Sequence, residues 1–206
     1  MGALTQVKPG VWRWDGVDAD HGFPIVGYIT NLTGRLVLID PPGTSGSREE
    51  IEAIGRPEAI ILTGKWHVRG APRWAKEFGI PIAAHESAVD ELKELGGTLD
   101  VALKDGDEYM GWRALYLSAE SSNYRYDELA YWDPDSKSLA IGDLVCEDDQ
   151  GRLGFGPHQF AGVPVESLKP ELDKVAVLEP RLVLSSHLGV REDTGLVLGG
   201  FLKLTK

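Results

Sequence analysis

Residues 59–79, AIILTGKWHVRGAPRWAKEFG, contain the pattern that decides the fold. The apolar run 59–62 lacks polar alternation, which is typical of a strand covered on both faces. A helix is expected over 72–78, and Gly79 ends it. The polar loop Thr63–His67 lies between the strand and the helix. A strand, a loop and a helix in this order indicate one unit of a sheet that is covered by helices.

The rest of the first half also consists of short strands and helices. An antiparallel meander is expected first, because three strand-like runs are separated by turn residues. Ser47, with Glu50 three residues later, predicts a helix start, and Gly55 predicts its end. Alternating strands and helices then favour a mixed or parallel sheet. The expected strands of this half are 11–14, 24–31, 35–40, 59–62 and 81–84, and its expected helices are 47–55, 72–78 and 87–95.

The second half has a similar order of elements. A hairpin is expected around the turn Asp133–Lys137, and residues 147–163 lack a regular pattern. A terminal helix is expected, although its glycines disfavour it. The expected strands are 112–117, 129–132, 138–141 and 181–187, with a helix over 165–178. Two strand-rich halves backed by helices predict an α/β (α+β) fold, a four-layer αββα sandwich of two mixed β-sheets with helices on the outer faces.

Length and composition favour one globular domain over residues 1–206. A net charge of −11 and an isoelectric point near 4.9 argue against nucleic acid and anionic membranes as partners, since both require clustered Lys and Arg. Cys146 is the only cysteine, so neither an intramolecular disulfide nor a Cys-rich zinc cluster is expected. A cytoplasmic location is expected, because neither a signal-peptide pattern nor a run of about 20 apolar residues is found.

Polar side chains follow directly after several apolar strands. Asp40, His67, Asp143 and His187 each stand where an expected strand runs out into a loop. Imidazole and carboxylate are common ligands of zinc and non-haem iron, and three such ligands leave a position open for water. A metal held in this way lowers the pKa of bound water towards about 7. The same residue types also cap helices and form turns, so spacing alone leaves both interpretations open.

The order of these motifs resembles the metallo-β-lactamase fold superfamily over nearly the whole chain. The resemblance rests on Leu38-Ile-Asp40, Ile61-Leu-Thr63, His67-Val-Arg-Gly-Ala71, Ile141-Gly-Asp143 and Ser186-His187. It implies an αββα sandwich whose site lies between the loop edges of the two sheets. It also implies hydrolysis of thioesters, lactones, phosphodiesters or β-lactams.

The loop after Thr63 departs from the family pattern. That pattern places His-x-His-x-Asp-His after the Thr, whereas here Thr63–His67 is two residues shorter and lacks the first two histidines. Trp66 stands at the aspartate position and cannot ligate a metal. The family's middle histidine falls near Ser118–Ser122, where Glu120 is a potential ligand or simply an exposed loop carboxylate. Without the gap, the four ligand positions fall on Gly64, Trp66, Val68 and Arg69, which leaves no metal ligand in the loop.

The resemblance therefore implies an empty first metal position and a reduced second one. The second position would hold at most one ion of Zn, Fe or Mn through His67, Asp143 and His187, which are also the expected catalytic residues. Lys65 and Arg69 place two cations in the same loop, where they would pair with Asp143 or with an anionic ligand, or remain solvated. The expected substrate-binding residues are Lys65, Arg69 and Glu120.

Two functions remain open at this point. The first is a hydrolase-like protein with a degenerate metal centre that acts on an ester, thioester, lactone or related bond of a small molecule. The alternative is a non-catalytic domain that binds a small molecule or regulates a partner and has lost its metals. The sequence does not fix the oligomeric state, and a homodimer stays an alternative.

Overall fold

The computed structural model describes residues 4–18, 22, 24–147, 153–187 and 189–192, which form two packed β-sheets. The first sheet has seven strands in sequence order: β1 (Leu4–Lys8), β2 (Val11–Val17), β3 (Pro24–Thr30), β4 (Val37–Ile39), β5 (Ala59–Ile61), β6 (Ile82–Ala84) and β7 (Val101–Ala102). Strands β1 to β4 pair antiparallel and β4 to β7 pair parallel. The meander and the following parallel segment are therefore confirmed, and the first sheet is mixed.

The second sheet has six strands in the order β15-β14-β11-β10-β9-β8. Their bounds are β8 (Glu108–Tyr109), β9 (Trp112–Glu120), β10 (Arg125–Asp133), β11 (Ser138–Ile141), β14 (Leu182–Ser185) and β15 (Gly189–Glu192). Strand β14 pairs parallel to β11, whereas the other neighbours pair antiparallel. The predicted hairpin is β10–β11. A separate two-stranded sheet joins β12 (Cys146–Glu147) to β13 (Leu153–Gly154).

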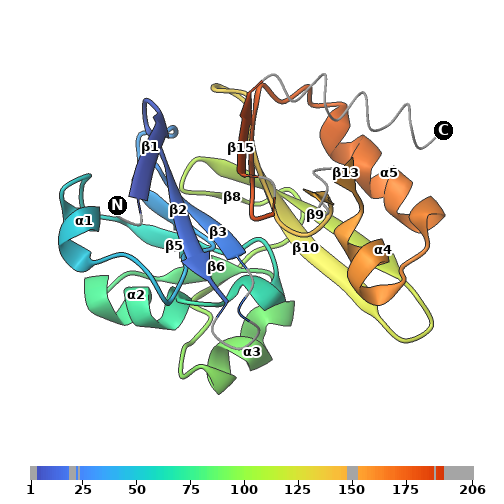
Figure 1. The fold of residues 1–206 in the computed structure, drawn as a ribbon, viewed down its shortest axis with the longest axis horizontal. Helices are drawn as coiled ribbons and strands as arrows, with labels where there is room; N and C mark the ends of the chain where they lie inside the picture. Colours follow the sequence, from blue (N-terminus) through green and yellow to red (C-terminus); the bar gives the residue numbers. More distant parts are fainter. Residues whose placement is uncertain (1–3, 19–21, 23, 148–152, 188, 193–206) are drawn as a thin grey trace.

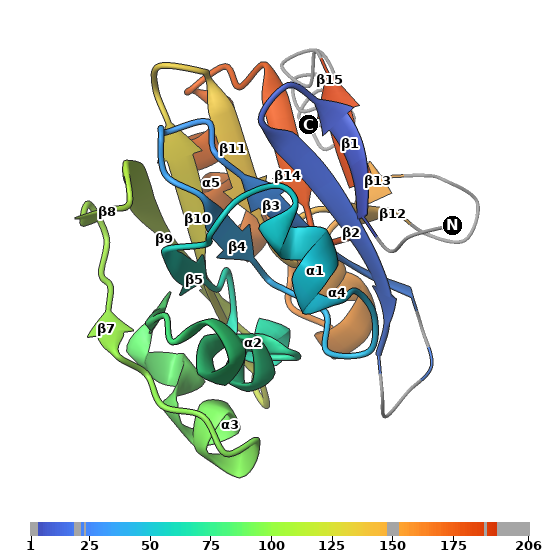
Figure 2. The same ribbon diagram turned by 90° about the vertical axis from the view of Figure 1, so that its left-hand side faces the viewer.

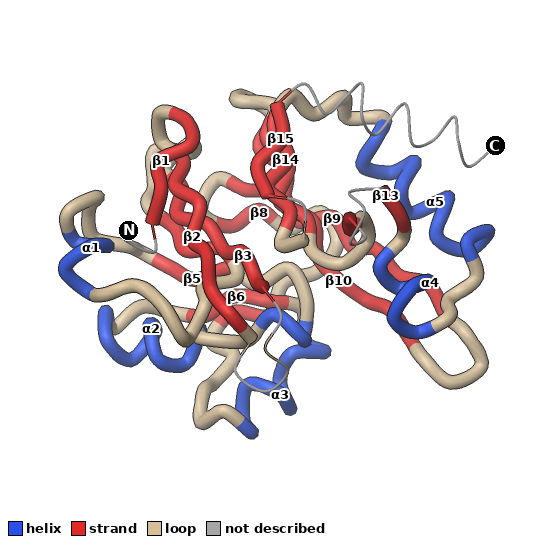
Figure 3. The backbone as a smooth tube through the Cα atoms, in the orientation of Figure 1, coloured by secondary structure: helices blue, strands red, loops and turns tan. Residues whose placement is uncertain are grey.

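Helices cover the outer faces of the two sheets. Figure 1 shows α1 (Arg48–Glu52), α2 (Ala71–Phe78) and α3 (Val89–Glu94) on one side, and α4 (Gly156–Ala161) and α5 (Val165–Ala176) on the other. In Figure 2, α1 and α2 lie in front of the strands of the first sheet. The strands fill the middle of the molecule and the helices its periphery (Figure 3). The predicted four-layer αββα sandwich is confirmed.

Three apolar clusters hold these layers together. Ile61, Leu129 and Tyr131 belong to the cluster between the two sheets, and Trp14 and Trp74 pack at 5.0 Å between their ring centroids in the cluster under α1 to α3. A third cluster lies between the second sheet and α5. Burying one such large side chain contributes about 1.5–3 kcal/mol, so these clusters are the main stabilising feature of the fold.

Local sequence signals explain where several helices begin and end. Ser47 Oγ accepts the Glu50 N–H at 3.2 Å, and Glu50 Oε2 accepts the Ser47 N–H at 2.9 Å, which confirms the capping box of α1. Gly79 ends α2 with a φ of 66°, a left-handed conformation that glycine adopts without strain. The predicted helix 87–95 is divided into a 3-10 turn, η2 (Glu86–Ala88), and α3.

Two sequence predictions are corrected. Residues 147–163 are not irregular throughout, because α4 occupies Gly156–Ala161 and β13 precedes it. Helix α4 is only six residues long, too short for a periodic pattern. After β14 the chain forms a further strand, β15, and most of the predicted terminal helix lies outside the described residues. Strands β1, β7 and β8 were not predicted; β7 and β8 have only two residues each.

Several hydrogen bonds join the two sheets where their strands end. Tyr28 Oη donates to the Ser185 carbonyl at 2.8 Å, and Tyr131 Oη donates to the Leu62 carbonyl at 2.9 Å. The Leu129 N–H donates to the Thr63 carbonyl at 2.7 Å. The loop after β5 is therefore fixed against β10. None of the helices in the described part of the chain is long and apolar enough to span a membrane.

Candidate metal centre

Three of the four strand-end residues converge on one point. His67 lies in the 3-10 turn η1 (Lys65–His67) after β5, Asp143 follows β11, and His187 follows β14. Asp143 Oδ1 lies 3.2 Å from His67 Nε2 and 2.8 Å from His187 Nε2, and the two Nε2 atoms are 3.4 Å apart. The structure thus brings together the three residues that the sequence singled out as metal ligands.

The fourth strand-end residue, Asp40, holds His67 from behind. Asp40 is fully buried, and its Oδ2 lies 3.0 Å from His67 Nδ1. The same carboxylate accepts hydrogen bonds from the Thr63 N–H and hydroxyl at 2.9 and 2.6 Å and from the Ser186 hydroxyl at 2.6 Å. A carboxylate on one ring nitrogen fixes the orientation of the ring, so the other nitrogen faces Asp143 and His187. Of the two interpretations that the sequence left open, Asp40 therefore follows the structural one, since it holds His67 and the loop in place.

The spacing of the three ligand atoms suits one divalent ion. Two imidazole nitrogens and a carboxylate oxygen are donors that zinc and similar metals accept. Tetrahedral coordination with bonds of about 2.0–2.1 Å places the ligand atoms about 3.3 Å from each other. The observed separations of 2.8–3.4 Å match this value. These three residues therefore fit a single divalent ion in donor type and in spacing.

The charges of this cluster depend strongly on one another. Burial and the Arg69 charge lower the pKa of His67, but the Asp143 and Asp40 carboxylates outweigh them and raise it to about 9. Burial raises the pKa of Asp143, but the charge of His67 and the hydrogen bond from His187 hold it well below its usual range. Without a metal, His67 is therefore a buried imidazolium between two carboxylates. A bound ion would replace that proton.

Comparison with known proteins identifies the family. The family described as the metallo-beta-lactamase superfamily matches residues 23–187. The chain belongs to the metallo-β-lactamase superfamily. Members of this superfamily typically bind divalent metals, and the converging His67, Asp143 and His187 are residues of the type that such ions require. No curated protein sequence matches the chain.

Solved metallo-β-lactamase structures share the fold at low sequence identity. The DIM-1 metallo-β-lactamase has a TM-score of 0.72 at 18% identity, covering 98% of this chain and 95% of its own. A metallo-β-lactamase from Pontibacter korlensis has a TM-score of 0.69 at 19% identity, covering 98% and 97%. One from Erythrobacter litoralis has a TM-score of 0.70 at 18% identity, covering 100% and 97%. This likeness shows the shared fold.

Lys65, at the opposite end of the loop from His67, carries a positive charge and has a carboxylate partner of its own. Lys65 Nζ lies 3.8 Å from Asp127 Oδ2 and sits over the rings of Trp66 and Tyr124, at 5.4 and 5.9 Å from their centroids. Lys65 thus pairs with Asp127 and not, as one sequence interpretation had it, with Asp143. The difference arises because Asp127 belongs to β10, which packs against this loop and was not recognised as a partner.

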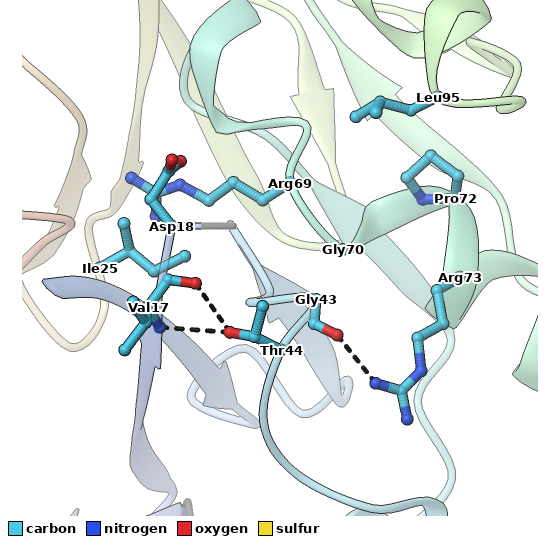
Figure 4. A pocket seen from close by; sticks show the side chains of 10 residues that line it. All are labelled: Val17, Asp18, Ile25, Gly43, Thr44, Arg69, Gly70, Pro72, Arg73 and Leu95. Atoms are coloured by element: carbon cyan, nitrogen blue, oxygen red, sulfur yellow. Dashed lines mark hydrogen bonds between the residues drawn. The ribbon is translucent and has the colours of Figure 1, made fainter. Parts of the chain in front are cut away.

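Arg69 lies beside the ligand cluster. Its Nη1 donates to the Val26 carbonyl at 3.2 Å, and its charge acts on Asp40 and Asp143 through space. The side chain lines a pocket of about 310 Å³ together with Arg73, and Figure 4 shows it extending towards Asp18. Arg69 therefore contributes to the electrostatics of the cluster from a neighbouring cavity.

Glu120 lies at the solvent-exposed end of β9. Its Oε1 is 3.6 Å from Arg125 Nη1, and both side chains are mostly exposed. The expectation of an exposed carboxylate fits this placement, although Glu120 ends a strand and is not in a loop. The structure does not bring Glu120 into the group formed by His67, Asp143 and His187.

Two further residues support the cluster and were not predicted. Glu128 is buried in β10, and its Oε2 accepts the Asp143 N–H at 2.7 Å. Burial and the Asp143 charge raise the pKa of Glu128 to about 8. Gly142 is packed so tightly that an added Cβ would lie 2.6 Å from Thr63 Oγ1 and 2.9 Å from His67 Cε1. The available signal for Glu128 was the acidic pair Asp127-Glu128 directly before the apolar run 129–132.

Proposed function

We propose that this protein is a hydrolase that holds one divalent ion, Zn, Fe or Mn, between His67, Asp143 and His187. It would cleave an ester, thioester, lactone or related bond of a small molecule. The observation that carries the proposal is the convergence of three ligand atoms within 4.8 Å of one another. An ion at this point supplies a water of lowered pKa, about 7, for attack on such a bond.

The surrounding residues serve this role by holding the ligands in place. Asp40 orients His67 through Nδ1, and Glu128 anchors the backbone N–H of Asp143. Both side chains are buried, so solvent does not compete with these contacts. The arrangement is preorganised, which is what a metal site of high affinity requires.

A single ion is favoured over the two-ion form. In the part of the chain that the structure describes, His67, Asp143 and His187 form the one group of three metal-ligand side chains that converges. Gly64 and Trp66 offer no ligand, and the Lys65 ammonium occupies the space beside Asp127 with a positive charge. A second cation there would be repelled.

The alternative function, a non-catalytic binding domain, is favoured by one specific observation. The pKa of His67 is raised to about 9, so at neutral pH its ring is a cation in the metal-free protein. This positive charge offsets the negative charges of Asp40 and Asp143 without an ion. A cluster that is compensated in this way is stable without an ion. In that case the superfamily fold would present a binding site only.

Metal content of the purified protein separates these functions. Protein prepared without chelator, analysed by mass spectrometry, should contain about one ion per chain, and His187→Ala should contain almost none. His158→Ala is the matched control, because the His158 ring lies in α4 and contacts the Val163 carbonyl, not the three ligands. This variant should bind metal like the parent protein. Absence of metal from the parent protein, even after incubation with Zn, Mn or Fe, would refute the proposal.

Activity is then measured with a panel of small esters, thioesters and lactones. Hydrolysis that depends on added metal and disappears in His187→Ala is the expected result. Stoichiometric metal without hydrolysis of any member of the panel would support the metal site but contradict the proposed hydrolysis of these bonds. Circular dichroism of each variant shows whether the fold is intact.

A further inference from the structure

Lys65 carries hydrogen-bond donors that the described residues leave unused. Its Nζ is 3.8 Å from Asp127 Oδ2, which is an ion pair but longer than a hydrogen bond. Within the described ranges no hydrogen-bond acceptor is recorded for this ammonium group, and the Lys65 side chain is 20% exposed. A lysine that is partly buried and lacks acceptors can bind an anion from solution without breaking an existing hydrogen bond.

The aromatic rings around Lys65 fix its position. The ammonium lies over Trp66 and Tyr124, and Trp66 Nε1 donates to Tyr124 Oη at 3.2 Å. The two rings are thus linked to each other as well as to the cation. Because the faces of aromatic rings attract a cation, they hold the Lys65 side chain in one place without using its N–H groups.

Asp127 does not block the approach of an anion. Its carboxylate is buried, with 5% of the side chain exposed, and it also lies 3.9 Å from His85 Nδ1. Asp127 is the more buried partner of this ion pair, and Lys65 is the more exposed one. An anion that comes from solution therefore meets the ammonium group first.

The group formed by Lys65, Trp66 and Tyr124 lies next to a metal ligand. Lys65 and His67 belong to the same 3-10 turn. Trp66, which lies between them in this turn, donates through Nε1 to Tyr124 Oη at 3.2 Å. A molecule bound at Lys65 would therefore extend towards the point where His67, Asp143 and His187 converge.

Two exposed aromatic side chains stand next to the same point. Trp66 is 56% exposed and precedes His67, and Phe160 is 69% exposed with its ring centroid 6.3 Å from that of His187. Aromatic side chains commonly line the sites at which proteins bind small molecules. They offer an apolar surface beside a positive charge.

We propose that Lys65 recognises an anionic group, in the first instance a carboxylate, on a substrate whose apolar part lies against Trp66 and Phe160. The inference rests on the proposed function and narrows its substrates to esters, thioesters or lactones that carry a negative charge and an apolar body. Lys65 contacts the substrate and does not take part in bond cleavage.

Metal-free protein, kept in chelator, tests this subsite without the ion. Phenylacetate and the neutral phenylacetamide are titrated separately, and binding is followed by the amide NMR shifts of residues 64–67. Phenylacetate should bind at least about tenfold more tightly than phenylacetamide, because only the carboxylate forms charge-assisted hydrogen bonds. Lys65→Met should remove this preference, and Lys65→Arg should keep most of it.

Lys93→Met is the matched control, since Lys93 also has a 3.8 Å ion pair, with Asp90, but is 69% exposed. It should bind phenylacetate like the parent protein. Equal affinity of the parent protein for the two probes, or unchanged phenylacetate binding by Lys65→Met with its fold intact, would overturn the inference. Because no metal is present, this result is independent of whether the protein binds an ion.

Discussion

At the two ends of the loop after β5, the charge of a carboxylate is compensated in different ways. At the His67 end, Asp143 faces two imidazole rings, which are neutral ligands once their protons leave. At the Lys65 end, Asp127 faces an ammonium group supplied by the chain itself. A carboxylate beside imidazoles can exchange a proton for a metal ion, whereas one beside a lysine is already neutralised. The partner of the carboxylate, more than the carboxylate itself, determines where a metal can bind.

Removing each carboxylate in turn is the strongest test of this contrast. Asp143→Asn should weaken zinc binding by more than about 100-fold, because loss of a ligand exceeds the 10–100-fold cost of changes behind the ligands. Asp127→Asn should leave zinc affinity within about twofold of the parent protein. Calorimetric titration measures both. Equal losses in the two variants would mean that the metal bridges both ends of the loop.

Substitution of the residues that hold His67 in place should have an intermediate effect on zinc affinity. Asp40→Asn keeps the size of the side chain but removes the charge that orients His67 at 3.0 Å. Zinc affinity should fall about 10–100-fold. Ser186→Ala, which removes one hydrogen bond to Asp40, should cost less. Competition with a coloured zinc chelator measures these affinities, and parent-like binding by Asp40→Asn would show that His67 needs no orienting partner.

The stability of the metal-free protein should fall as the pH rises from 6.5 to about 9.5. The pKa of His67 is raised to about 9 and that of Glu128 to about 8, so the folded state binds more protons than the unfolded state in this range. Stability from His67 is fully present below its unfolded pKa of 6.5 and is lost as pH passes its folded pKa. The expected loss is on the order of 5 kcal/mol, since each pKa unit corresponds to about 1.4 kcal/mol.

Urea unfolding in chelator at pH 6.5 and 9.5 measures this loss. Glu128→Gln should reduce the dependence on pH, because it removes one of the two groups. Saturating zinc should reverse the trend between pH 6.5 and 8, since metal binding requires a deprotonated His67. Metal-free protein that is more stable at pH 9.5 than at pH 6.5 would contradict the raised pKa of His67.

Among these variants, the smallest change in zinc affinity is expected for Lys65→Met. Lys65→Met removes a positive charge near the proposed ion, so zinc affinity should stay the same or rise by about twofold, and less at high salt. Calorimetry at two salt concentrations measures this change. A large decrease would show that Lys65 holds the ligand loop in place.

The fold could be predicted in large part because it is encoded locally. The strand 59–62, the hairpin around Asp133–Lys137 and the capping box at Ser47 each depend on neighbouring residues, and all three are present in the structure. Helix α4 was missed because six residues give too little periodicity. Local sequence signals therefore predict an element with a distinct pattern, cap or turn better than a helix as short as α4.

The candidate site could be predicted only in part. His67, Asp143 and His187 stand at strand ends, and packing of the two sheets brings strand ends together. The pairing of Lys65 with Asp127 joins residues 62 positions apart and depends on how β10 lies against the loop. The contact of Glu128 with Asp143 depends on the same packing. Such partners are set by tertiary structure and leave no fixed spacing in the sequence.

The difference between the Lys65 end and the His67 end of the loop is tested most directly by a crystal soaked in zinc. Anomalous diffraction is recorded at the zinc edge. One anomalous peak per chain is expected, within about 2.0–2.2 Å of His67 Nε2, Asp143 Oδ1 and His187 Nε2. A peak beside Asp127, a second peak in the same pocket, or no peak at the three ligands would contradict the proposal that this fold holds one ion at its His67 end.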